Sequence, residues 1–115
     1  MNWLIRILTF FAPKIDGNPL EWKERDYHLL DNLWREFLCG SVKGIYRFRD
    51  NEFQVLAVHN TKKNNHFDIV LEWFENSCKR DKCSLSFLEV GNPKLKQKLE
   101  RLGFNGTKDK MVKNY

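Results

Sequence analysis

Two adjacent stretches of alternating side chains constrain the fold of this chain most strongly. Residues 41–49 and 52–59 both alternate apolar and other side chains, which is the periodicity of a β-strand. Between them stands Asp50-Asn51, and both residue types tolerate the left-handed backbone that a tight hairpin needs. We therefore expect an antiparallel hairpin with one apolar face, which is formed by Val42, Tyr46, Phe48, Phe53, Val55 and Ala57.

Helical patterns lie on both sides of this hairpin. Residues 26–39 and 67–79 carry apolar side chains at helical spacing, and Gly40 is placed as a C-cap of the first helix. In a third helix, 93–102, Asn92 is the expected N-cap and Pro93 the first helical residue. A further strand is expected at 84–90, in the centre of the sheet. Residues 104–115 are expected to form a last strand, or a hairpin around Gly106 or Asp109. The predicted core comprises Leu71, Phe74, Phe87, Leu95, Leu99 and Leu102.

This order of elements predicts one α/β (α+β) domain that spans residues 1–115, with helices packed on a mixed, twisted sheet. The apolar segment 1–12 is too short to span a bilayer and is interrupted by Arg6. It is expected to be a buried first strand, or alternatively an amphipathic surface helix. Three cysteines without a secretion signal indicate reduced thiols and a cytoplasmic protein. The net charge of +5 fits either solvated lysines or an anionic partner.

The C-terminal half resembles a known family. The segment LSFLEVGNPKLKQKLERLGF, residues 85–104, is similar to the fifth strand and fourth helix of the GNAT superfamily of acetyl-CoA-dependent N-acetyltransferases. Asn92 and the closing Leu102-Gly103-Phe104 carry that similarity. VLAVHNTKKNNHFDIVLEWF, residues 55–74, resembles the family's fourth strand, cofactor loop and third helix, and KDKMVKNY resembles its last strand. The resemblance covers residues 41–115 and implies an acyl-CoA N-acyltransferase-like fold, truncated before that region.

Departures from the family pattern concern the cofactor. The family's loop reads Gln/Arg-x-x-Gly-x-Gly/Ala, whereas Lys63, His66 and Asp68 stand at the corresponding positions here. A histidine side chain is expected to block close approach of the backbone, and Asp68 is expected to cap the helix and repel a diphosphate. Leu99 stands where many members carry a tyrosine that donates a proton to the departing thiolate.

The candidate site residues follow partly from the resemblance. It implies cofactor contacts by Val58, Lys62, Lys63, Asn64, His66, Asp68 and Asn92. Glu52 and His59 flank the strand that normally provides a general base, and both are alternatively exposed residues at the strand ends. Glu89 is expected to be structural. Neither zinc-type cysteine spacing nor a third ligand beside His59 and His66 is present, so no metal is expected.

Two functions from different classes remain open. The first is a non-catalytic GNAT-like interaction module, without a cofactor, that binds an unknown protein or nucleic acid. The second is an N-acetyltransferase that uses acetyl-CoA through a variant loop. The departures from the family pattern favour the first, in which acetyl-CoA binds weakly or not at all. A homodimer is plausible in either case, because the fold often exposes a strand edge.

Overall fold

The computed structural model describes residues 14–15, 18–27 and 33–115, and within these ranges it contains nine strands and two helices. The strands are β1 Lys14–Ile15, β2 Asn18–Pro19, β3 Trp22–Asp26, β4 Arg35–Cys39, β5 Val42–Arg49, β6 Glu52–Asn60, β7 Ser84–Leu88, β8 Asn105–Thr107 and β9 Lys110–Lys113. The helices are α2 His66–Asp81 and α3 Pro93–Arg101. The predicted segment at residues 1–12 lies outside the described residues. No helix among the described residues is long and apolar enough to cross a membrane.

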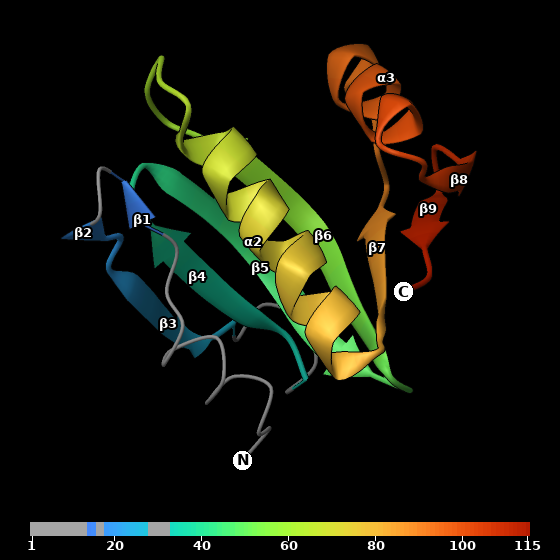
Figure 1. Ribbon diagram of the computed structural model, residues 1–115, viewed down its shortest axis with the longest axis horizontal. Helices are drawn as coiled ribbons and strands as arrows, with labels where there is room; N and C mark the ends of the chain where they lie inside the picture. Colours follow the sequence, from blue (N-terminus) through green and yellow to red (C-terminus); the bar gives the residue numbers. More distant parts are fainter. Residues whose placement is uncertain (1–13, 16–17, 28–32) are drawn as a thin grey trace.

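Seven strands form one sheet in the order β3-β4-β5-β6-β7-β9-β8, and β1 and β2 form a separate two-stranded sheet. All neighbouring strands in this sheet are antiparallel except β6 and β7, which run parallel. The parallel pair requires a crossover connection, and α2 provides it (Figure 1). The predicted mixed sheet is therefore confirmed. The prediction that strand 84–90 lies at its centre is wrong, because β6 is the fourth strand and β7 the fifth.

The hairpin of β5 and β6 confirms the predicted strands and turn, although Ala57, expected on the apolar face, is exposed. Arg49 pairs with Glu52, and the two residues between them both have positive φ, 55° for Asp50 and 58° for Asn51. These are the dihedral signs of a type I′ turn, whose twist matches that of the flanking strands. Asn51 also donates from its side chain to the Lys82 carbonyl, at 3.1 Å, so the turn is tied to the end of α2.

The helix predicted at residues 26–39 is wrong for the part that the structure describes. Residues 35–39 form strand β4, which pairs with β3 on one side and β5 on the other. Phe37 and Cys39 are buried whereas Leu38 between them is 43% exposed, which is an alternation of period two. Gly40 does not cap a helix; with φ of +60° it belongs to the tight turn between β4 and β5. Pairing on both edges has overridden a local helical pattern.

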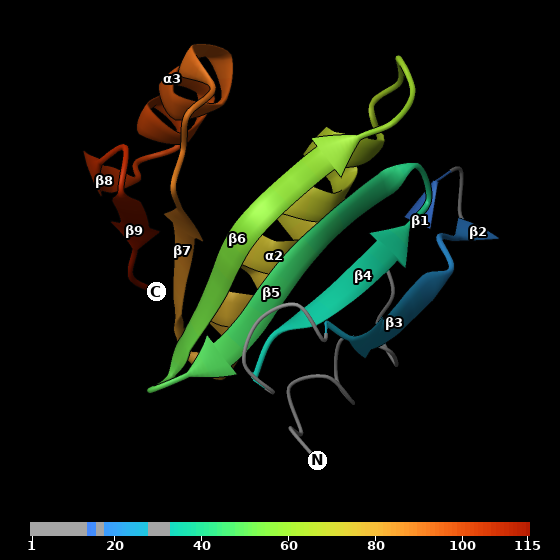
Figure 2. The same cartoon turned by 180° about the vertical axis from the view of Figure 1, so that it is seen from behind.

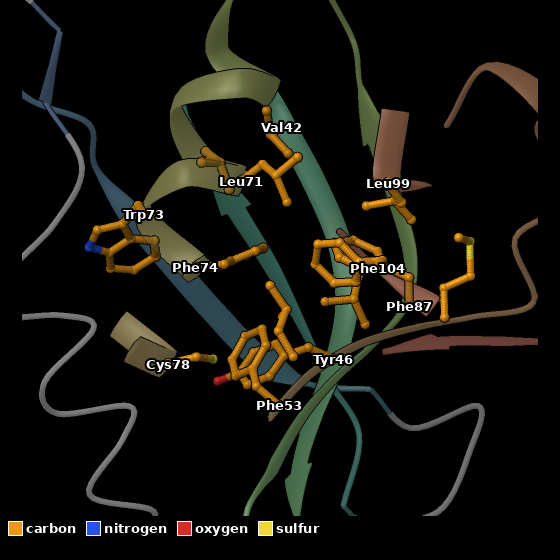
Figure 3. Close-up of a cluster of buried hydrophobic side chains, with 14 of the residues drawn as sticks. Val42, Tyr46, Phe53, Leu71, Trp73, Phe74, Cys78, Phe87, Leu99 and Phe104 are labelled. Atoms are coloured by element: carbon orange, nitrogen blue, oxygen red, sulfur yellow. The ribbon is translucent and has the colours of Figure 1, made fainter. Parts of the chain in front are cut away.

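The core lies between the sheet and α2, which crosses one face of β5 and β6 (Figures 1 and 2). Its centre is a group of aromatic rings: Tyr46 stacks on Phe53 at 4.9 Å between centroids, and Phe53 contacts Phe74 of α2 at 4.9 Å (Figure 3). Of the predicted core residues, Leu71, Phe74, Phe87 and Leu99 are buried. Leu95 and Leu102 are only partly buried and pack against the edge of this core.

Leu99 provides a test of this core. Because its side chain is fully buried, Leu99→Ala should lower the free energy of unfolding by about 2–5 kcal/mol through lost contacts and a residual cavity. Urea denaturation followed by circular dichroism measures this change. The matched control is Leu38→Ala, which removes the same atoms from a 43% exposed site and should change stability by no more than about 0.5 kcal/mol. Equal losses for the two variants would contradict the burial described above.

Candidate functional site

The parallel strands β6 and β7 separate along their length and leave a cleft between them. Their pairing begins at Glu52 and Ser84 and ends at Val55 and Phe87, although β6 continues to Asn60. Figures 1 and 2 show the two strands diverging from this paired base. The cleft has a volume of about 240 Å³ and is lined by Val55, Leu56, Ala57, Val58, Phe87, Leu88, Glu89, Val90, Gly91, Asn92 and Leu95.

Hydrogen bonds on the far side of β7 explain why the pairing stops. After β7 ends at Leu88, the Glu89 N–H donates to the Asp109 carbonyl and the Val90 N–H donates to the Lys108 carbonyl. The chain is thereby drawn toward the β8–β9 turn and away from β6. Glu89 has φ of +53°, a conformation that a residue with a Cβ seldom adopts. The contacts with the turn hold it there.

An irregularity in β6 lies opposite the same point. Ile45 of β5 pairs with Ala57, and the next residue, Tyr46, pairs with Val55. Leu56 is therefore an extra residue in β6, which is a β-bulge. A bulge bends its strand and increases the local twist, so β6 turns away from β7 where the pairing ends.

The walls of the cleft are mainly apolar. Glu89, whose side chain is exposed, is the one titratable residue among those that line it. The Asn92 side chain also reaches the cleft, but its oxygen accepts the backbone N–H of Lys94 at 2.9 Å and so caps α3, as predicted. Pro93 follows as the first helical residue. The cleft therefore suits a slender apolar or amide-bearing ligand rather than a highly charged one.

The loop between β6 and α2 follows the end of β6 that lies away from its paired base. Its two lysines, Lys62 and Lys63, are exposed to solvent. Its asparagines are held in a polar network: the Ser41 hydroxyl donates to the Asn60 side-chain oxygen at 2.6 Å, and the Asn64 amide donates to the Ser41 hydroxyl at 3.0 Å. The loop is thus anchored to the β4–β5 turn on the side of β6 away from β7.

His66 does not take the position expected from the sequence. Its Nδ1 accepts the Ser41 backbone N–H at 3.1 Å and lies 3.0 Å from the Ser41 hydroxyl oxygen. A Cβ on Gly40 would come within 2.7 Å of the same ring nitrogen, so a glycine is required beside it. The imidazole is fixed against the β4–β5 turn, which lies across β6 from the cleft. The ring is therefore directed away from the side on which a ligand would approach α2.

Asp68 is not the N-cap of α2, which corrects the sequence prediction. Asn65 occupies the N-cap position, and its side chain makes no capping hydrogen bond. The Asp68 carboxylate forms an ion pair with Lys98 of α3, whose ammonium lies 5.5 Å from the centre of the Phe67 ring. Within the described residues, the backbone N–H groups of Phe67 and Asp68 have no hydrogen-bond acceptor. The first turn of α2 therefore retains donors that an anion could use.

Glu52 and His59, the two candidate bases, lie outside the cleft lining. Glu52 forms an ion pair with Lys110, with 2.9 Å between Nζ and Oε1. Burial raises the pKa of the Glu52 carboxyl, but the neighbouring Ser86 hydroxyl and the Lys110 ammonium outweigh burial, so the pKa lies below its ordinary value. His59 is exposed and stands opposite Lys43 on the sheet face that α2 does not cover.

That open face contains a second and larger hollow. It has a volume of about 670 Å³ and extends over β3, β4, β5 and β6. His59 and Lys43 line it, together with Leu38 and Ile45. Ala57 and Val58 line both this hollow and the cleft, so the bulged part of β6 separates the two spaces. Among the described residues, no group of three or more His, Cys, Asp or Glu side chains could hold a metal ion.

Sequence reasoning found some of these features and missed others. Val58 and Asn92 line the cleft, whereas the loop residues expected to contact a cofactor do not. Glu89, Gly91 and Lys98 were not predicted as part of the site. The dipeptide Gly91-Asn92 before Pro93 signals that β7 must end nearby, but it does not show which way the chain turns. No sequence signal joins Lys98 to Asp68, because the two residues are 30 positions apart.

Comparison with known proteins gives a fold but no family. No family model matches the sequence, and no curated protein matches it significantly. The structure is similar to the solution NMR structure of YhhK from E. coli, a candidate N-acetyltransferase solved bound to coenzyme A. The TM-score is 0.60 at 9% identity, and the match covers 84% of this chain and 98% of YhhK. The likeness, together with the strand order, shows that this chain has the GNAT-like acyl-CoA N-acyltransferase fold.

Proposed function

We propose that this chain binds coenzyme A or a short acyl-CoA in the cleft between β6 and β7, and that binding rather than acyl transfer is its role. The observation that carries this proposal is the end of β6–β7 pairing at Val55 and Phe87, which opens an apolar cleft. The open end of that cleft meets the start of α2. YhhK, which shares the fold, was solved with coenzyme A bound, and this supports the choice of ligand.

The residues of the cleft fit the parts of such a ligand. A pantetheine arm is narrow, with two amides joined by short apolar links, and it requires an apolar channel with backbone partners. Among the described residues, no strand pairs with the β7-facing edge of β6 beyond Val55, around Leu56 and Val58, so this edge offers such partners. A diphosphate could reach the Phe67 and Asp68 N–H groups, with the exposed Lys62 and Lys63 adding positive charge.

Two of the three departures from the family pattern have partners in the structure that offset them. His66 is directed toward Ser41, and the charge of Asp68 is paired with Lys98. The third departure, Leu99 in place of a tyrosine, concerns catalysis and has no such partner. Leu99 stands where the resemblance implies a proton donor, and it is fully buried and aliphatic. Tyr46 and Tyr115, whose pKa values burial raises, donate to Glu24 and Glu75 and do not line the cleft.

Calorimetric titration with coenzyme A tests the proposed binding, and the cleft offers a matched pair of variants. A Cβ at Gly91 would meet no atom within 4 Å, and its φ is not positive, so larger side chains should not disturb the fold. We expect micromolar binding by the wild type and by Gly91→Ala, but weaker binding by Gly91→Trp, whose indole is large enough to obstruct the cleft that Gly91 lines. At 100 times Kd, coenzyme A should stabilise the fold by about 2.7 kcal/mol, seen as a higher Tm. Equal binding by Gly91→Trp would place the ligand elsewhere.

The second candidate function is acyl transfer to a small acceptor on the open face of the sheet. It is favoured by one observation: the hollow of about 670 Å³ shares Ala57 and Val58 with the cleft and has His59 on its wall. His59 would then accept the proton of the acceptor amine. Interaction with a protein or nucleic-acid partner, and formation of a homodimer, remain hypotheses from the sequence.

A thiol-release assay with acetyl-CoA and a panel of small amines separates the two candidates. Under our proposal, release of free coenzyme A does not rise above the uncatalysed rate with any amine. If release does rise, transfer is the function, and His59→Gln should lower kcat by about 10²–10⁴ while coenzyme A affinity stays the same. Lys43→Gln, which changes a neighbouring side chain in the same hollow, serves as the control for a simple change of charge.

A further inference from the structure

An ion pair joins the two helices that flank the open end of the cleft. Asp68 lies in the first turn of α2, and Lys98 lies in α3 three residues after Leu95, which lines the cleft. Residues three apart share one side of a helix, so Lys98 projects on the cleft side of α3. Its ammonium pairs with the Asp68 carboxylate and lies 5.5 Å from the Phe67 ring centre.

Asp68 is at the position where a carboxylate most affects an anionic ligand. It occupies the same helical turn as the unpaired Phe67 and Asp68 N–H groups, so a diphosphate bound by these donors would lie close to its negative charge. Alone, this carboxylate would weaken binding by repulsion. Lys98 cancels that charge, and it does so from a different element, on the opposite side of the cleft.

The pair is also easy to open. Its side chains are 38% and 59% exposed, and exposed ion pairs of this kind contribute little to stability. A lysine ammonium on a flexible stem can change partners without movement of its helix. Coenzyme A would offer phosphate oxygens within the region that Lys98 already reaches, and these carry more charge than a single carboxylate.

We propose that Lys98 is a ligand-binding residue that pairs with Asp68 while the cleft is empty. When coenzyme A enters the cleft, the Lys98 ammonium leaves the Asp68 carboxylate and pairs with a ligand phosphate. This inference rests on the proposed function of the cleft. Asp68 and the ligand then compete for the same ammonium, so Asp68 limits affinity while Lys98 provides it. The pair makes binding selective for a phosphate-bearing ligand over an uncharged acyl chain of similar width.

A purely structural ion pair would behave differently. If the pair only holds α2 and α3 together, then removing either partner should weaken coenzyme A binding in the same direction. If Lys98 exchanges partners, the two removals should have opposite signs. Lys98→Met takes away the phosphate contact and leaves Asp68 uncompensated, whereas Asp68→Asn removes both the competitor and the repulsion while it leaves Lys98 free.

The test is calorimetric titration of the full chain with coenzyme A at low and high salt. We expect Lys98→Met to raise Kd about tenfold and to reduce its salt dependence, and Asp68→Asn to lower Kd about threefold. The double variant should bind more tightly than Lys98→Met alone. Lys96→Met, which breaks the exposed Lys96–Glu100 pair on the same helix, removes the same charge and should change Kd by less than about twofold.

The outcomes separate the two proposals. Absence of coenzyme A binding by the wild type overturns both the proposed function and the role of Lys98. Wild-type binding with weaker affinity in both Asp68→Asn and Lys98→Met leaves the function standing but reduces the pair to a structural contact. Equal effects of Lys96→Met and Lys98→Met would show that only the net charge of α3 matters. Circular dichroism of each variant checks that these exposed substitutions leave the fold intact.

Discussion

The hydrogen bonds that Glu89 and Val90 make with the turn at residues 108–109 determine where this molecule is open. Two parallel strands that begin in register would ordinarily remain paired to their ends, since each unpaired N–H or carbonyl costs free energy when it is buried. Here the backbone of β7 finds its partners on the opposite side instead. The β8–β9 hairpin is therefore the element that holds the cleft open, although its residues do not line it.

The closed end of the cleft needs an equally firm support, and the aromatic core provides it. Phe53 and Val55, at the paired base of β6, are both buried under α2. Phe53 contacts Tyr46 on one side and Phe74 on the other. Close-packed rings of this kind resist small displacements. Strand β6 is thus rigid where it pairs with β7 and bends at the Leu56 bulge. The cleft begins where the paired segment gives way to the bend.

The local parts of this fold could be predicted from the sequence, and the parts set by distant contacts could not. Asp50-Asn51 and Asn92-Pro93 act through their own backbone preferences, so the hairpin and the start of α3 were predicted correctly. Residues 35–39 have no such local determinant. Their apolar side chains fit a helical stripe, but β3 and β5 on either side make them a strand. The bulge at Leu56 likewise depends on the partner strand, whose register no local pattern specifies.

In the candidate site, too, distant contacts decide what the sequence could not show. They compensate for some departures from the family pattern and leave others uncompensated. His66 and Asp68 are polar side chains at the surface, and each has a partner from a distant segment that redirects or neutralises it. No partner side chain can compensate in this way for the aliphatic side chain of Leu99. It is fully enclosed beside Phe104 and Phe87 in the core, so a tyrosine there would overpack its surroundings and bury a hydroxyl. To present an acid to the cleft, α3 would have to rotate and give up this packing. The departure at Leu99 is therefore built into the packing of α3, whereas the unusual loop is a matter of surface charge, and this contrast is one ground for our proposal that the chain binds coenzyme A.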